Sequence, residues 1–108
     1  MDIEAVWRVE MLGVHDWEVV STAFLEGGRY LGGGAHGYSV GRYHRDGDKV
    51  VIRAKVTLYV NGLTIFGRGS GRFEITYDAE AREGQLIGNV TDGQYSVHFR
   101  SIRVGDIP

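Results

Sequence analysis

Two glycine-containing motifs are the parts of this chain whose residue types and spacing could support chemistry. Residues 32–37, GGGAHG, match the GxGxxG pattern of dinucleotide-binding loops, and residues 37–41, GYSVG, match the GxSxG pattern of hydrolases. Both motifs depend on a strand that turns directly into a helix, which presents N–H groups to a pyrophosphate or a serine to a substrate. The residues that follow alternate as in a strand. We therefore expect neither a nucleotide site nor a nucleophilic Ser39.

The four histidines show no spacing typical of a metal site. They are His15, His36, His44 and His98, and none lies in an HExxH pattern. His36 and His44 would be about 27 Å apart along one strand at ~3.3 Å per residue, too far to share an ion. The chain also has no cysteine. We expect no metal, no cofactor and no enzymatic activity.

Composition limits the class of protein and its partners. The 108 residues correspond to one domain, spanning 1–108. The net charge of −2 comes from 12 basic and 14 acidic residues that are well mixed, which argues against nucleic-acid binding and against a charged membrane surface. The N-terminal sequence MDIEAVWRVEML is acidic and alternating, unlike a signal peptide, and no apolar run approaches the ~20 residues of a membrane-spanning helix. We expect a cytoplasmic protein.

Apolar and polar residues alternate along most of the chain, the pattern of a strand with one buried face. Asp46-Gly47, Asn61-Gly62 and Asp92-Gly93 are hairpin-turn signals between such runs. The expected strands are 4–12, 17–25, 29–33, 36–45, 49–60, 72–77, 86–90 and 95–99. Residues 78–84, DAEAREG, are compatible with one helical turn. Ile102 and Val104 change the parity of the last strand, which predicts a bulge near residues 100–101.

Eight strands with short turns and almost no helix predict an all-β fold, an eight-stranded antiparallel up-and-down barrel. Such a barrel is either filled by side chains or holds one small ligand. The candidate cavity residues are Trp7, Val9, Met11, Tyr43, Val56, Leu58, Tyr95, Val97 and Phe99. They form either a plain core or the lining of an apolar cavity. Glycines at 32, 33, 34, 41 and 88 favour some empty interior space.

One stretch carries a family resemblance. An early strand with Trp7 is followed by LEGGRYLGGG at 25–34, VGRY at 40–43, RDGD at 45–48 and the long strand 49–60. This pattern resembles the GrlR family, negative regulators of type III secretion genes. The resemblance implies a lipocalin-like barrel with an apolar interior, no catalytic activity, a homodimer, and a protein partner that is a transcriptional activator.

The resemblance also implies a partner site at the turn before the long strand, where the family has an acidic tetrad. The matching residues are Arg45, Asp46, Gly47 and Asp48, of which two are acidic and the first is basic. Two hypotheses follow. The chain is a regulatory module that binds a protein through Arg45, Asp46 and Asp48, or it is a barrel that binds a small, lipid-like molecule.

Overall fold

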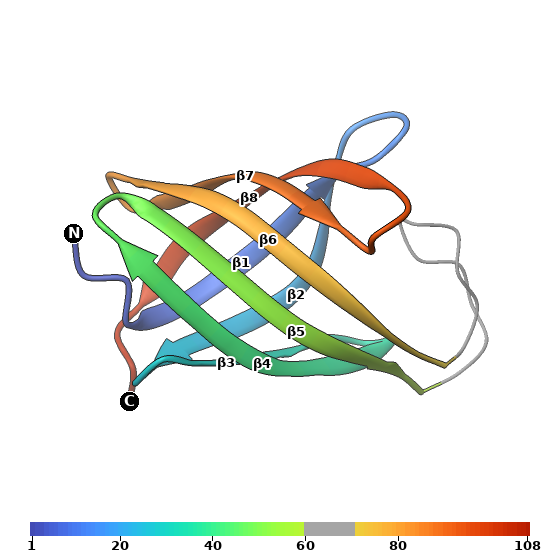
Figure 1. Cartoon of the computed structure of the whole chain (residues 1–108), viewed down its shortest axis with the longest axis horizontal. Helices are drawn as coiled ribbons and strands as arrows, with labels where there is room; N and C mark the ends of the chain where they lie inside the picture. Colours follow the sequence, from blue (N-terminus) through green and yellow to red (C-terminus); the bar gives the residue numbers. More distant parts are fainter. Residues whose placement is uncertain (60–70) are drawn as a thin grey trace.

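The computed structural model describes residues 1–59 and 71–108, which form a closed antiparallel barrel (Figure 1). The strands of the described residues are β1 (Ala5–Leu12), β2 (Trp17–Glu26), β3 (Arg29–Gly33), β4 (Gly37–Asp46), β5 (Lys49–Leu58), β6 (Arg72–Arg82), β7 (Gln85–Thr91) and β8 (Ser96–Gly105). Each strand pairs with the next, and β8 returns to β1. The predicted up-and-down barrel is confirmed. Among the described residues, no helix is long and apolar enough to cross a membrane.

The barrel interior is filled by the inward residues of the alternating strands. Trp7, Leu25, Leu86 and Phe99 are the largest of the fully buried apolar side chains. The ring of Tyr77 lies edge-on to that of Phe99, with 4.8 Å between centroids. Edge-to-face contacts of this kind add to the free energy gained from burial. The interior midway along the barrel is therefore a packed core.

The inward glycines allow strands to approach closely instead of emptying the interior. A Cβ atom at Gly41 would lie 1.9 Å from the carbonyl oxygen of Arg53 on β5. A Cβ atom at Gly88 would lie 1.9 Å from the carbonyl oxygen of Asp78 on β6. No side chain fits at such distances, so these glycines let the barrel wall bend sharply. The expectation of empty space at these two positions is wrong.

The predicted helical turn at residues 78–84 is also wrong. Strand β6 continues to Arg82, with Ala79 and Ala81 buried against β5 and β7. The alanines alternate with outward charged residues, so the segment has period two as well as helix-forming residues. Cross-strand pairing on both sides outweighs a weak helix propensity.

The bulge in the last strand lies later than predicted. Pairing of β7 with β8 is continuous from residue 96 to 102, and Ser101 is buried on the same face as Phe99. The register shift involves Val104, because Trp7 pairs with Arg103 while Val6 pairs with Gly105. The polar Ser101 at an inward position concealed the regular alternation in the sequence.

The two ends of the barrel differ. The chain before β1 closes one end, where Ile3 is 3% exposed and its carbonyl oxygen accepts a hydrogen bond from Trp7 Nε1 at 3.0 Å. Both termini lie at this end (Figure 1). The opposite end carries the turns after β1, β3 and β7. The predicted Asn61-Gly62 turn and the last residue of the predicted strand 49–60 lie outside the described residues.

Candidate functional site

The described residues enclose a cavity of about 300 Å³ toward the end of the barrel opposite the termini. Strands β1, β3 and β5 contribute their last residues to it, and β2, β4 and β6 contribute their first. It is lined by Met11, Glu18, Val19, Val20, Ser21, Gly32, Gly33, Gly34, His36, Gly37, Tyr38, Ser39, Val56, Leu58, Phe73, Ile75 and Tyr77. Its volume is at the lower end of the range typical of small-molecule sites.

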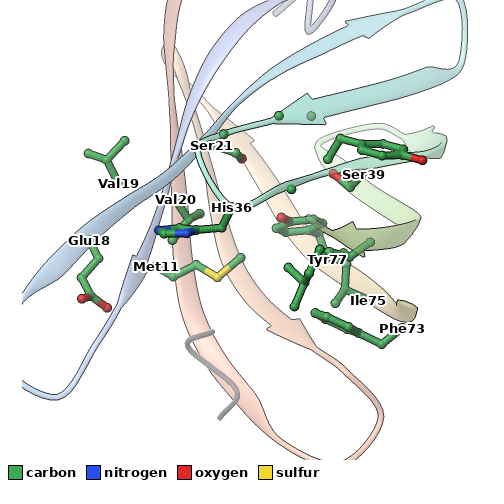
Figure 2. A pocket seen from close by; sticks show the side chains of 17 residues that line it. Met11, Glu18, Val19, Val20, Ser21, His36, Ser39, Phe73, Ile75 and Tyr77 are labelled. Atoms are coloured by element: carbon green, nitrogen blue, oxygen red, sulfur yellow. The ribbon is translucent and has the colours of Figure 1, made fainter. Parts of the chain in front are cut away.

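The walls of the cavity are mainly apolar. Phe73, Ile75 and Tyr77 are alternate residues of β6 and therefore point to the same side of the sheet. Figure 2 shows these three side chains gathered on one side of the cavity, with Met11 and His36 opposite them. Alternation within one strand thus builds a continuous apolar wall.

Hydroxyl groups converge at the inner end of the cavity. Ser39 on β4 lines it, and a Cβ atom at Gly32 would lie 2.7 Å from Ser39 Oγ and 2.8 Å from the Tyr30 hydroxyl. The hydroxyls of Tyr30 and Tyr77 are 3.5 Å apart. Burial raises the pKa of Tyr77 well above its ordinary value, so this phenol remains a hydrogen-bond donor. The missing side chain at Gly32 makes room for these groups.

A β-bulge shapes the rim. Val9 pairs with Ser21 while Glu10 pairs with Val19, so β2 has one extra residue, Val20, at this point. The bulge turns Glu18 to the side of Met11, its direct cross-strand partner. Bulges of this kind occur often at barrel rims and beside binding sites, where they redirect a side chain.

Of the predicted cavity residues, Met11, Val56 and Leu58 line this cavity. Trp7 and Val9 border only a void of about 10 Å³ deeper in the barrel, which is large enough for no more than a water molecule.

The other four predicted cavity residues line neither space. Phe99 is buried in the core, and Tyr43 and Val97 pack against it. The prediction for Tyr95 is wrong, since it precedes β8 in the turn and is 54% exposed. Its carbonyl oxygen accepts hydrogen bonds from Thr91 Oγ1 and from the backbone N–H of Asp92, which holds it in the turn.

The sequence prediction missed Ser39 and the wall of β6. The signal was present, because Ser39 shares strand parity with Gly37 and Gly41, and the β6 residues alternate regularly. What alternation alone cannot show is which end of a barrel stays open. That depends on where the N-terminal segment packs.

The predicted partner-binding turn lies at the closed end. Asp46 and Asp48 are exposed there at the β4–β5 hairpin. Arg45 is half-buried and donates hydrogen bonds from Nε to the carbonyl oxygen of Gly47 at 2.8 Å and from Nη1 to that of Met1. Arg45 thus ties the hairpin to the N-terminus, while the two carboxylates face solvent.

The described residues contain no group of three or more histidine, aspartate or glutamate side chains that could hold a metal ion. The polar groups of the cavity can orient a ligand by hydrogen bonding. They comprise the Ser21 and Ser39 hydroxyls, with Glu18 and His36 toward the rim.

Searches of protein-family models, of curated proteins and of solved structures found no match to this chain.

Proposed function

We propose that this protein is a non-catalytic binding module that holds a small, largely apolar molecule at the open end of its barrel. The observation that carries the proposal is the cavity of about 300 Å³, closed below by the packed core and lined by Met11, Phe73 and Ile75. Apolar walls supply affinity by removing ligand surface from water. The hydroxyl of Ser39 supplies orientation, so the ligand is expected to carry a hydrogen-bonding group at its inner end.

Titration with N-phenyl-1-naphthylamine, a neutral dye that fluoresces in apolar surroundings, tests this proposal. We expect saturable binding with one site per chain. Val56→Phe fills part of the cavity and should weaken binding by about tenfold or more, which corresponds to ~1.4 kcal/mol. Ile87→Phe is the matched control, because Ile87 is exposed on β7 away from the cavity. Non-saturable binding, or equal loss in both variants, would refute the proposal.

A second candidate function is the regulatory role implied by the resemblance to the GrlR family. In this proposal the barrel is cytoplasmic and dimeric, and it restrains a transcriptional activator of type III secretion genes. The observation that favours it is the exposure of Asp46 and Asp48 on one hairpin, where they could meet a basic partner. Ligand occupancy of the cavity could then bias this interaction through a shift between conformations.

A pull-down from the native host with wild-type protein and with Asp46→Arg/Asp48→Arg tests the second candidate. The wild type should capture a transcriptional regulator, identified by mass spectrometry, and the double variant should not. Glu80→Arg on neighbouring β6 serves as a control for charge reversal at an exposed site. Capture of the same proteins by all three would remove support for a partner site at this turn.

A further inference from the structure

The outer wall of the barrel carries an exposed apolar row that neither proposed function uses. Phe24 on β2 pairs with Leu31 on β3, and Leu31 pairs with Val40 on β4. These side chains are 37%, 51% and 46% exposed, respectively. They are direct cross-strand neighbours on one face, so they form a continuous strip and not scattered single residues. We call these three residues the apolar row.

A row of three arginines lies beside the apolar row on the same face. Arg29 on β3 pairs with Arg42 on β4, which pairs with Arg53 on β5. All three are exposed. Arg29 and Arg42 each lie two residues along their strand from a member of the apolar row, so the two rows are about 7 Å apart. Beside Arg53, the corresponding position on β5 is Lys55, the cross-strand partner of Val40. We call these residues the arginine row.

By itself, the arginine row lowers the stability of the folded protein. Like charges directly opposite each other on a sheet destabilise it. On the adjoining strands, Glu26 lies directly opposite Arg29, and Glu74 and Asp78 lie diagonal to Arg53. Within residues 1–59 and 71–108, none of these carboxylates comes within ion-pair distance of the three arginines. Within the described residues, Arg42 and Arg53 therefore have no carboxylate directly opposite them, although the net charge of the protein is −2.

We propose that the paired rows bind an acidic protein segment in extended conformation. A strand lying along the rows points alternate side chains to opposite sides. Apolar side chains would then cover Leu31 and its neighbours, while carboxylates would reach the arginines. Arginine suits this role because its guanidinium can hold a carboxylate through two parallel hydrogen bonds.

The shape of the surface supports this occupant. A hollow of about 530 Å³ lies over the apolar row, and its lining includes Arg29, the carboxylate Glu26 opposite it, and residues Ile107 and Pro108. Ile107 and Pro108 thus form one side of a hollow over the apolar row, while Arg42 and Arg53 continue the arginine row outside its lining. The hollow can accept the apolar side of a peptide, and the arginines beside it, Arg42 and Arg53, can meet carboxylates on the other side of that peptide.

The same residues fit nucleic acid less well. Binding of single strands depends on aromatic side chains on which bases stack, and Phe24 is the only aromatic residue in the two rows. The acidic net charge further opposes a polyphosphate, whereas a short acidic segment needs only a local positive row.

Fluorescence anisotropy with a labelled peptide of alternating leucine and glutamate tests the inference. We expect binding that weakens with salt and exceeds, by about tenfold or more, binding of the leucine–lysine and serine–glutamate counterparts. Arg42→Glu/Arg53→Glu and Leu31→Ser/Val40→Ser should each reduce affinity by about tenfold. Arg42→Glu alone should also raise the melting temperature, since it places a carboxylate between two arginines.

The control is Arg72→Glu/Arg82→Glu on β6, which changes net charge equally but lies outside the rows. It should leave peptide affinity unchanged. All variants should bind N-phenyl-1-naphthylamine normally, so this test is independent of the cavity. Equal loss in the control, no preference for the leucine–glutamate peptide, or tighter binding to an oligonucleotide or to phosphatidylserine vesicles would overturn the inference.

Discussion

At the scale of single residues, Glu10 on the outer face of β1 is held by two arginines. Its Oε2 accepts a hydrogen bond from Arg8 Nε at 2.8 Å, and its Oε1 accepts one from Arg100 Nη2 at 2.9 Å. The Arg100 guanidinium also lies 4.2 Å from the ring centre of Trp17. Hydrogen bonds from Arg100, then from Arg8, lower the pKa of Glu10. This cluster joins β1, β2 and β8 where the barrel closes.

Glu10→Gln should therefore destabilise the protein more at neutral pH than in acid. A carboxyl whose pKa is lowered by folding contributes stability above its ordinary pKa, and this contribution is lost as pH falls through the lowered value. We expect a loss of about 1–2 kcal/mol at pH 7, the scale of hydrogen bonds to charged groups. Urea unfolding at pH 7 and at pH 3 measures it. Glu74→Gln, at an exposed position outside the cluster, should show little effect at either pH. A loss for Glu10→Gln that is the same at both pH values would contradict the argument.

At the scale of elements, β4 and β5 lie so close together at Gly41 that adding one methyl group there should strongly destabilise the protein. Gly41→Ala would place Cβ against the Arg53 carbonyl oxygen and should cost about 3 kcal/mol through displaced backbone. Gly33→Ala is the matched control, since its Cβ would meet nothing within 4 Å. Thermal unfolding followed by circular dichroism compares the two. Similar melting temperatures would show that the wall at Gly41 can relax.

The strands also show which features of the fold could be predicted from sequence patterns. Period-two alternation predicted each strand because one face is buried and the other wet, as in β1. It failed where the preference of the residues for a helix disagrees with their pairing in the folded protein. Ala79 and Ala81 are helix-forming residues that lie in strand β6. It also failed at Ser101, since one polar inward residue looks like a change of parity. Strand pairing on both sides decides such cases, and a single strand does not carry that information.

At the scale of the whole molecule, the candidate site follows from a difference between the two ends of the barrel. The sequence indicated Met11, Val56 and Leu58 through their inward parity, and the structure brings them together at the open end. Trp7 and Phe99 also occupy inward positions of their strands and were therefore also predicted to line the cavity, but they fill the core. Closure by the chain before β1 separates these two groups. Ile3 continues the alternation of β1, and alternation alone does not show that this residue caps one end of the barrel.

Removal of residues 1–4 should thus destabilise the barrel without abolishing the cavity. The deletion exposes the surface buried by Ile3 and takes away the acceptor of the Trp7 indole N–H. Together these changes should cost about 3 kcal/mol, most of it from the apolar side chain. Removal of residues 106–108, where Ile107 is only half-buried, should cost less. Urea unfolding compares the two truncations, and dye titration below their transitions measures the cavity. If the N-terminal truncation lost dye binding while folded, the two ends would be coupled through the core, and the cavity could not be treated as a site independent of the closed end.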